Sequence, residues 1–393
     1  FLSFLNNIDR SDWSKVPSIS YRGFEKEIMQ NPRCKRISSL SEIPSPYLAG
    51  DFEPLMKASP EEEWIDLWET NRGCPFFCSY CDWGSAIHNK LYTFEMDRLI
   101  KEIDWFSQHK IEFVYCCDAN FGILPRDIEI IKHFAENKKK YGYPKALSVQ
   151  NTKNSTETSY RIQKMLSEGG LNKGVTLSLQ SLNKEALKSV KRDNISLEVF
   201  QKLQKRFISE DIETYTDVIL GLPNETYGTF SEGISRIIEN GQHSRIQFNN
   251  LSVLPNAELS DPAYKNKYGL VIQETRIVNF HGSLNNVDEI FETQKLVVGT
   301  KTMPKEDWVR VRVCSFMISL LYFDKVLQIP MVILHYICSL SFKEMTEIFT
   351  EDKNLPPLIS EIRSFFFDKA ARIQNGDVEY CQSEEWLNIW WPA

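Results

Sequence analysis

The stretch "NRGCPFFCSYCDWGS" at residues 71–85 places three of the chain's nine cysteines within a short loop. Cys74, Cys78 and Cys81 give the spacing C-x3-C-x2-C. Three thiols leave one place of a four-ligand metal site open. The stretch therefore indicates a disulfide framework, a zinc site completed from elsewhere, or an iron–sulfur site whose last ligand is supplied by a substrate.

The cysteine count separates the first of these alternatives from the others. Nine is an odd number, and three cysteines so close in sequence do not pair comfortably with one another. This usage favours reduced thiols in a cytoplasmic protein over a secreted disulfide framework.

A closed zinc site needs four ligands, so the triad would have to recruit a distant fourth. The candidates are His88, Cys34, Cys116 and Cys117. None of them stands at a zinc-knuckle spacing. A 4Fe-4S cluster, by contrast, can be held by three thiolates when a substrate binds the fourth iron. The loop carries aromatic residues that can shelter such a cluster, namely Phe76, Phe77, Tyr80 and Trp83.

Composition and charge indicate a globular protein that is not a general nucleic-acid binder. Apolar residues make up 42% and charged residues 25% of the 393-residue chain, and the net charge is −7. The N-terminus has no initiating Met and no signal-peptide pattern, and we interpret it as a cut inside a longer protein. The apolar stretch at 313–340 is interrupted by charged and polar residues, which predicts two buried helices and no membrane span.

Six β-rich runs alternate with helical patterns through the middle of the chain. The predicted strands are 64–70, 111–117, 146–150, 174–180, 213–221 and 245–253. The predicted core stripes of the helices are Leu99, Ile103 and Phe106; Ile162, Met165 and Leu166; Phe230, Ile234, Ile237 and Ile238. Repeated βα units require right-handed crossovers and give a parallel sheet. We predict an α/β fold whose parallel sheet is either doubly wound or curved into a partial (β/α)6 TIM-like barrel. In barrels of this kind the chemistry lies at the carboxyl ends of the strands.

The segments on either side of the barrel differ from it in pattern. Residues 1–60 are punctuated by proline and glycine and predict an extended lead-in. Residues 61–260 are predicted to form the barrel. Residues 261–393 are predicted to be a mainly helical region that helps to define the substrate.

"ETNRGCPFFCSYCDWG" at 69–84 resembles the signature of the radical S-adenosylmethionine (SAM) enzymes, whose partial barrel matches the six βα units. The segments "IPSPYLAGDF" (43–52), "CDANFGILPRD" (117–127) and "DVILGLPNET" (217–226) resemble the branch that carries a cobalamin-binding domain before the barrel. The resemblance implies a 4Fe-4S cluster whose open iron is chelated by SAM. Electron transfer from the reduced cluster then cleaves SAM to a 5'-deoxyadenosyl radical.

The resemblance also implies roles for individual residues. Cys74, Cys78 and Cys81 are expected to ligate the cluster, and Tyr80 is expected to lie beside the adenine through its backbone. Asp118 and Asn120 are expected to hold the SAM amino group, although "DAN" departs from the family's glycine-rich motif with Glu. A helix-capping role for Asp118 stays open.

Two glutamines follow the third and fourth predicted strands. Gln150 and Gln180 are expected to bind the ribose or the carboxylate of SAM, with satisfaction of backbone groups as the alternative.

The expected function is cobalamin-dependent methylation of an unactivated carbon of a small-molecule or peptide substrate. An electron donor such as flavodoxin or ferredoxin is expected as a partner, with no membrane and no general nucleic-acid binding. No D-x-H-x-x-G cobalamin motif occurs in the sequence, so cobalamin is expected to be held by a domain outside it. The alternatives are other radical SAM chemistry, namely rearrangement, oxidation or sulfur insertion, and a zinc-stabilised interaction protein without enzymatic activity.

Overall fold

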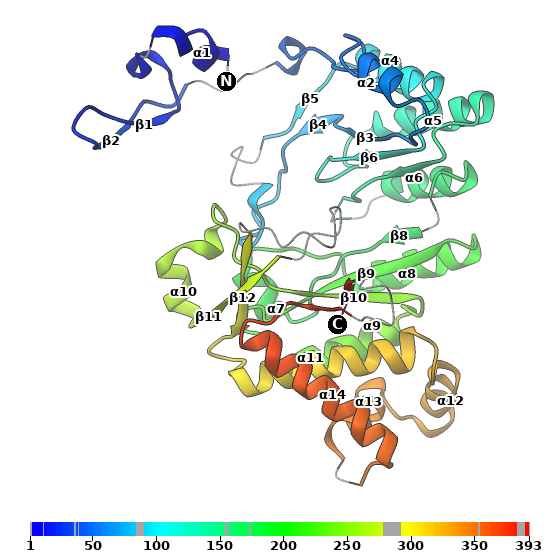
Figure 1. The fold of residues 1–393 in the computed structure, drawn as a ribbon. Helices are drawn as coiled ribbons and strands as arrows, with labels where there is room; N and C mark the ends of the chain where they lie inside the picture. The colour runs from blue at the N-terminus through cyan, green and yellow to red at the C-terminus, as the bar shows by residue number, and fades with distance from the viewer. Residues whose placement is uncertain are drawn as a thin grey trace.

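The six predicted strands form two parallel three-stranded sheets that share one curved wall (Figure 1). This computed structural model describes residues 2–10, 12–34, 37, 39–83, 90–152, 154, 157–172, 174–277, 292–352, 354–382 and 390–392. The first sheet has the order β3 (Ile65–Trp68), β6 (Phe113–Cys116), β7 (Ala146–Ser148). The second has the order β8 (Gly174–Thr176), β9 (Glu213–Leu220), β10 (Arg245–Asn250). The predicted α/β class and partial barrel are confirmed.

The wall is divided between β7 and β8, which do not pair as strands. Asn151 Nδ2 donates to the Thr176 carbonyl across this seam at 3.1 Å, and Leu147 N donates to the Leu171 carbonyl at 2.9 Å. Loop hydrogen bonds therefore replace a ladder here, and the barrel consists of two sheets where the sequence predicted one.

Helices cover the outer face of both sheets. They are α4 (Met96–Gln108), α5 (Asp127–Tyr141), α6 (Glu157–Glu168), α7 (Lys184–Ser189), α8 (Leu197–Ser209) and α9 (Tyr227–Glu239). The fourth crossover contains two helices, α7 and α8. Asn183 caps α7, Ser196 caps α8 and Thr226 caps α9 through side-chain oxygens, which fixes where each of these helices begins. The predicted stripes on α4, α6 and α9 face the core, with Met165 the one partly buried member.

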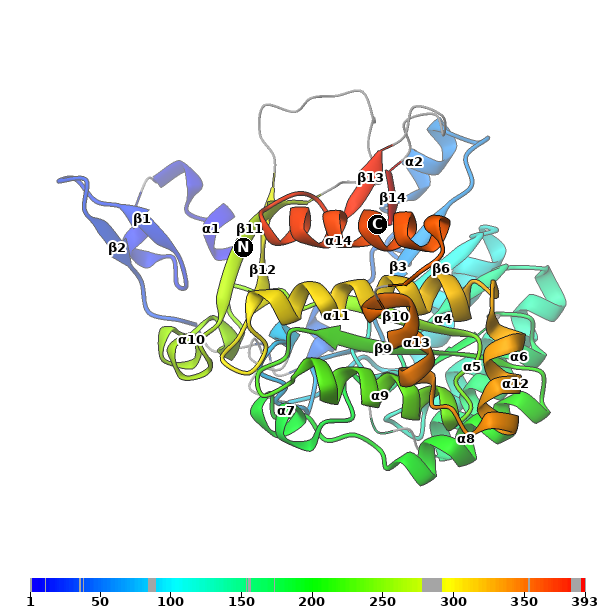
Figure 2. The same cartoon turned by 90° about the horizontal axis from the view of Figure 1, so that it is seen from below.

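The N-terminal segment contains short elements and is less extended than the sequence predicted. They are α1 (Leu2–Leu5), η1 (Ile8–Arg10), η2 (Trp13–Lys15), the antiparallel pair β1 (Ser20–Arg22) and β2 (Ile28–Gln30), η3 (Leu40–Glu42) and α2 (Glu53–Ala58). The β1–β2 pair lies apart from the barrel, as both views show (Figures 1 and 2). Tyr47 anchors the later part, because its hydroxyl donates to the Leu67 carbonyl and its ring packs against Trp105 and Phe106.

After the barrel the chain is mainly helical, as predicted, with two antiparallel strand pairs that were not predicted. The elements are η4 (Glu258–Ser260), α10 (Pro262–Tyr268), β11 (Val271–Arg276), β12 (Thr293–Gly299), α11 (Lys305–Ile318), the π-turn η5 (Ser319–Phe323), α12 (Gln328–Cys338), α13 (Phe342–Glu351), α14 (Pro357–Gln374), β13 (Tyr380–Gln382) and β14 (Trp390–Pro392). In Figure 2 the helices α11, α13 and α14 lie over one side of the second sheet.

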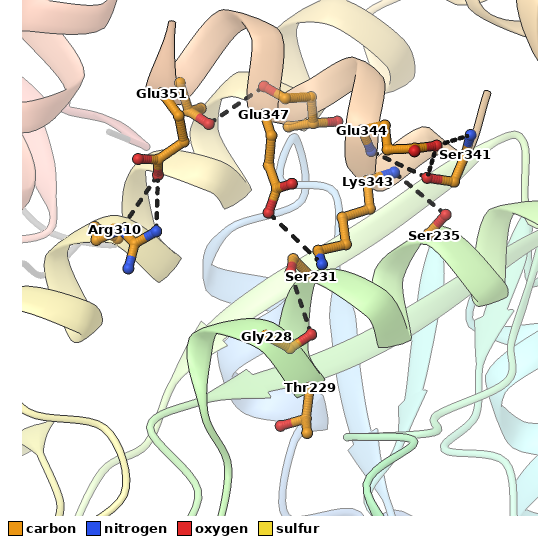
Figure 3. A network of polar contacts seen from close by, with 12 residues as sticks. Gly228, Thr229, Ser231, Ser235, Arg310, Ser341, Lys343, Glu344, Glu347 and Glu351 are labelled. Atoms are coloured by element: carbon orange, nitrogen blue, oxygen red, sulfur yellow. Dashed lines mark hydrogen bonds and ion pairs between the residues drawn. The ribbon is translucent and has the colours of Figure 1, made fainter.

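Polar contacts fasten α13 to the barrel helix α9 and to α11 (Figure 3). Ser235 on α9 accepts a hydrogen bond from the backbone nitrogen of Lys343 at 3.2 Å. Glu351 at the end of α13 pairs with Arg310 of α11 at 3.2 Å. Beneath these contacts α9 and α11 share one hydrophobic cluster, so the C-terminal helices and the second sheet form one packed unit.

The two helices predicted to be buried at 313–340 differ from each other. The α11 helix is buried, whereas α12 exposes Ile329 (72% exposed), Tyr336 (77%) and Ile337 (77%). In the described part of the chain no single helix is long and apolar enough to cross a membrane. The pair 305–323 and 328–338, bent by 94°, passes the length and composition test only when its two parts are taken together.

Trp68 at the end of β3 holds the first sheet against its helices. Its indole nitrogen donates to Glu102 at 2.7 Å, and its ring meets Phe106 and Phe134 edge-on. We expect Trp68→Ala to lower the free energy of unfolding by about 3–5 kcal/mol in chemical denaturation followed by circular dichroism, because it leaves a cavity and an unpaired buried acceptor.

The neighbouring residue provides the control for this substitution. Leu67 is 68% exposed, so Leu67→Ala should change the free energy of unfolding by less than about 0.5 kcal/mol. Equal effects of the two substitutions would contradict the assigned role of Trp68.

Candidate functional site

The cysteine loop begins where β3 ends. The chain first forms β4 (Asn71–Arg72), which pairs antiparallel with β5 (Tyr92–Thr93). Gly73 follows with φ +122°, a conformation that side-chain-bearing residues rarely adopt, and it turns the backbone into Cys74. Pairing of β4 with β5 and the glycine turn thus direct the three cysteines away from the strand into a loop.

Cys74 and Cys78 are buried and Cys81 is half-buried. None of the three is joined in a disulfide, nor is any other cysteine whose side chain the structure describes, so the disulfide alternative finds no support. Within the described ranges no group of three or more His, Cys, Asp or Glu side chains is close enough to hold a single metal ion. A 4Fe-4S cubane does not require the thiolates to converge on one ion, because each thiolate binds a separate iron.

Asp118, which follows β6, holds the start of the cysteine loop. Its side chain is 1% exposed. It accepts hydrogen bonds from the backbone nitrogens of Thr70 (2.8 Å) and Asn71 (3.1 Å), from Asn71 Nδ2 (2.6 Å) and from the Thr70 hydroxyl. Burial raises the pKa of Asp118, and these donors oppose the rise. These four hydrogen bonds tie Asp118 to the loop entrance, and a further one joins it to Cys116 at the end of β6. The structure therefore supports a positioning role, different from both the SAM contact and the helix cap considered above.

Asn120 lies directly against the first cysteine. Its Nδ2 donates to Cys74 Sγ at 3.1 Å, and the side chain is 1% exposed. Its Oδ1 is buried without a hydrogen-bond partner among the described residues. A buried acceptor without a donor is costly, which points to a ligand group that donates a hydrogen bond beside Cys74. The loop thus presents three thiols and one vacant acceptor, which fits a cluster whose fourth iron is bound by an amino-acid ligand.

The structure brings Tyr80, Gln150 and Gln180 together around one cavity of about 480 Å³ at the strand ends. The amide oxygen of Gln180 is buried without a described partner, and its backbone has φ +64°. Gln150 is exposed and donates to the Tyr115 hydroxyl at 3.0 Å. Tyr80 is half-buried, and burial raises its pKa. The sequence predicted that Gln150 and Gln180, at the ends of the third and fourth strands, face one mouth, and the structure places both at this cavity.

Sequence reasoning missed the polar residues on β9 and β10 that complete the cavity. They are Asp217, Gln247, Asn249 and Asn250. Asp217 accepts from the Ser178 hydroxyl at 2.6 Å. The alternation of polar and apolar residues in "RIQFNN" was the available signal, because strand side chains point to opposite faces in turn.

Arg192 is the second feature that sequence reasoning missed. Its side chain is 3% exposed, with Nε donating to Asn194 Oδ1 (2.9 Å) and Nη2 donating to the Ser178 carbonyl (2.5 Å). Its Nη1 is buried without a described partner, and its charge acts on Tyr80 of the cysteine loop. No acidic side chain among the described residues pairs with it, and a buried cation of this kind calls for an anion.

The remaining cysteine and histidine candidates lie elsewhere or outside the description. Cys116 is fully buried in the core of the first sheet, and Cys117 Sγ faces the Tyr115 carbonyl at 3.7 Å. Cys34 is exposed in the N-terminal segment. His88 lies outside the described residues.

Comparisons with known proteins agree with this geometry. The model of the radical SAM superfamily matches residues 68–237. The cobalamin-dependent radical SAM methyltransferase TokK of Streptomyces tokunonensis is 40% identical over 304 residues, which is 77% of this chain and 44% of TokK. The 2-(S-pantetheinyl)-carbapenam-3-carboxylate methyltransferase of Streptantibioticus cattleyicolor is 38% identical over 303 residues, again 77% and 44%. The chain therefore spans less than half the length of these relatives.

A solved structure with a similar fold is the radical SAM methyltransferase TsrM of Kitasatospora setae, with cobalamin and a [4Fe-4S] cluster bound. Its TM-score is 0.54 at 13% identity, covering 78% of this chain and 64% of TsrM. At this identity the likeness concerns the fold alone. The matched barrel, the cysteine spacing and the curated relatives together show that this chain belongs to the radical SAM superfamily.

Proposed function

We propose that this chain is the catalytic barrel of a cobalamin-dependent radical SAM methyltransferase that acts on a small molecule. The observation that carries the proposal is its 40% and 38% identity to two named methyltransferases over 77% of its length. The strand-end cavity supports a small-molecule substrate, because its lining is rich in amide side chains that can donate and accept hydrogen bonds.

We assign Cys74, Cys78 and Cys81 as ligands of a 4Fe-4S cluster. Asn120 supports this assignment, because its amide donates to Cys74 Sγ and leaves an acceptor oxygen for a donor on the fourth ligand. The amino group of SAM has the required chemistry. Asp118 acts one step further away by holding Thr70 and Asn71 at the loop entrance.

The strand-end cavity and Arg192 are suited to the carboxylate, ribose and adenine of SAM. We assign the SAM carboxylate to Arg192, whose buried Nη1 is without a described partner. The free amide oxygen of Gln180 can accept from a ribose hydroxyl or from the ammonium, and the adenine is expected beside the backbone of Tyr80. Gln150, whose amide faces Tyr115, borders the same cavity and is assigned to the ribose side.

When bound, the cluster would supply the electron that cleaves SAM reductively, and cobalamin would supply a transferable methyl group. The chain's own residues bind and orient. Burial of Cys74, Asn120 and Asp118 keeps water from the loop entrance, and the cavity holds the substrate at the strand ends. We expect the enzyme to work in the cytoplasm with a protein electron donor, in keeping with cysteines that are not joined in disulfides.

The decisive experiment is anaerobic reconstitution with iron and sulfide, followed by SAM, a reductant and hydroxocobalamin. About four irons per chain and formation of 5'-deoxyadenosine would support radical SAM chemistry. Formation of S-adenosylhomocysteine would support methyl donation. Colourless protein holding one zinc would overturn the proposal. In a protein that also carries a cobalamin-binding domain, 5'-deoxyadenosine without S-adenosylhomocysteine would favour the other radical outcomes.

The cluster assignment predicts that the three loop cysteines act together. Replacing Cys74, Cys78 or Cys81 by Ala removes one of three protein ligands, so each variant should lose the cluster absorbance and SAM cleavage. Cys34→Ala, at an exposed site in the N-terminal segment, should keep both. A Cys78→Ala variant with full iron content and normal turnover would refute the assignment.

The positioning role of Asp118 predicts a loss of cluster retention. Asp118→Asn exchanges a carboxylate that accepts four hydrogen bonds for an amide with a single acceptor oxygen, which loosens the loop entrance. Iron should pass to a chelator at least about tenfold faster than in the unaltered protein, for a loss of roughly 1.5 kcal/mol or more. The control is Asp104→Asn, which alters a half-exposed carboxylate of α4 that contacts α5, and this variant should release iron at the normal rate. If Asp118→Asn bound SAM more weakly but released iron at the normal rate, a direct contact between Asp118 and SAM would be favoured instead.

The assignment of Arg192 predicts weaker SAM binding at intact iron content. Arg192→Lys keeps the charge but loses the planar fork, and a lost hydrogen bond to a charged group weakens affinity roughly tenfold to a hundredfold. Calorimetric titration of the iron-loaded protein with SAM measures this. Lys188→Gln, which removes an exposed neighbouring cation, is the matched control. If Arg192→Lys bound SAM with unchanged affinity, Arg192 would have a structural role only.

A further inference from the structure

A second hollow lies behind the cysteine loop, separate from the strand-end cavity. It is a groove of about 750 Å³ whose wall includes α7, the following segment 191–197 and Arg236 of α9. One residue of the cysteine loop, Phe77, reaches it. Phe77 is 63% exposed, whereas the adjacent Cys78 is 6% exposed. At this groove, therefore, the surface of the protein comes within one residue of the buried cluster ligand Cys78.

Hydrogen bonds join the wall of this groove rigidly to the cysteine loop. Ser79 N donates to the Val190 carbonyl at 3.0 Å, next to the end of α7. The Tyr264 hydroxyl donates to the Ser189 carbonyl at 2.8 Å and lies 3.2 Å from the Ser79 hydroxyl. The backbone of Ser79 also accepts from Leu259 N at 2.8 Å. A protein bound in the groove would thus be held at a fixed position relative to the cysteines.

The groove is basic in a chain that is acidic as a whole. Its exposed or half-exposed charged residues are the cations Lys184, Lys188, Lys191 and Arg236 and the acids Asp193 and Glu198. The buried Arg192, assigned above to the SAM carboxylate, also lines it. Over the whole chain, acids outnumber lysine and arginine by seven. The local excess of positive charge is therefore opposite in sign to the net charge, which is the pattern of a surface that attracts an acidic partner.

The positive charge continues beyond the groove. An adjoining hollow of about 520 Å³ shares Lys188 and adds Lys267 and Lys301, against one acid, Glu185. Lys184, Lys188, Lys267 and Lys301 form no ion pair with an acidic side chain in the described ranges. Lys191 differs, because it pairs with Glu258 at 2.5 Å. We call these four unpaired lysines, together with Phe77, the basic face.

We propose that the basic face is the docking surface for an acidic, flavodoxin-type electron-donor protein. The inference rests on the proposed function, because only a redox cluster in the loop requires an electron from outside. One electron leaves the flavin hydroquinone of the donor and enters the cluster, and no covalent bond forms or breaks. Redox partners dock through small, charge-steered contacts, and a basic rim around one exposed aromatic side chain has this character.

The test compares two double charge reversals that change the net charge equally. Lys184→Glu with Lys188→Glu alters the basic face, and Lys132→Glu with Lys139→Glu alters exposed positions of α5 as the control. The rate of cluster reduction by reduced flavodoxin is followed by stopped-flow absorbance at low and high salt. We expect the basic-face variant to be slower by about tenfold or more at low salt and to approach the control at high salt, because salt screens steering. Fluorescence anisotropy of labelled flavodoxin should show the same loss in binding.

Dithionite separates failure of this inference from failure of the proposed function. As a small reductant it needs no docking surface, so both variants should cleave SAM with dithionite at the rate of the unaltered protein. Equal flavodoxin rates in both variants, or rates without salt dependence, would overturn the docking surface while leaving the proposed function intact. Absence of a cluster, or of SAM cleavage with dithionite, in the unaltered protein would overturn the proposed function itself.

Discussion

The site depends on one buried carboxylate. Asp118, at the end of β6, binds the backbone and side chains of Thr70 and Asn71, which follow β3. Arg126 supports the same turn by donating to the carbonyls of Thr70 (2.7 Å) and Phe94 (2.5 Å). Two neighbouring parallel strands are thereby locked together at their carboxyl ends, and the cysteine loop starts from that fixed point. This lock fixes the start of the loop before Cys74, and the hydrogen bonds of Ser79 fix its later part.

Features encoded locally were predicted from the sequence. The strands were recognised because β-rich runs recur at the spacing of βα units. The core stripe of α4, namely Leu99, Ile103 and Phe106, was recognised because helical periodicity is a short-range property. The cysteine triad was recognised by its spacing, which needs no partner elsewhere. The strand-end positions of Gln150 and Gln180 were sufficient to place both in one cavity, because parallel strands present their carboxyl ends at the same edge.

Features that depend on distant contacts were not predicted. Arg192 lies in an ordinary charged segment, and only the fold shows its guanidinium buried beside Ser178. The seam between β7 and β8 arises because loop residues such as Asn151 take over the hydrogen bonds, which no propensity reveals. The exposed face of α12 also escaped prediction, since its apolar sequence suggested burial and the 94° bend after α11 turns it away from the core.

The short loop around Ser79 separates two approaches to the cysteines. Phe77 borders the basic groove, while Tyr80, three residues later, borders the strand-end cavity. Ser79 between them is fixed by Val190, Leu259 and Tyr264. Phe77 is therefore held at the groove and Tyr80 at the cavity. An electron donor at the groove and a substrate in the cavity would therefore not compete for one entrance. On the proposed assignment, the same backbone that shields Cys78 from solvent would give the cluster one face for electrons and another for chemistry.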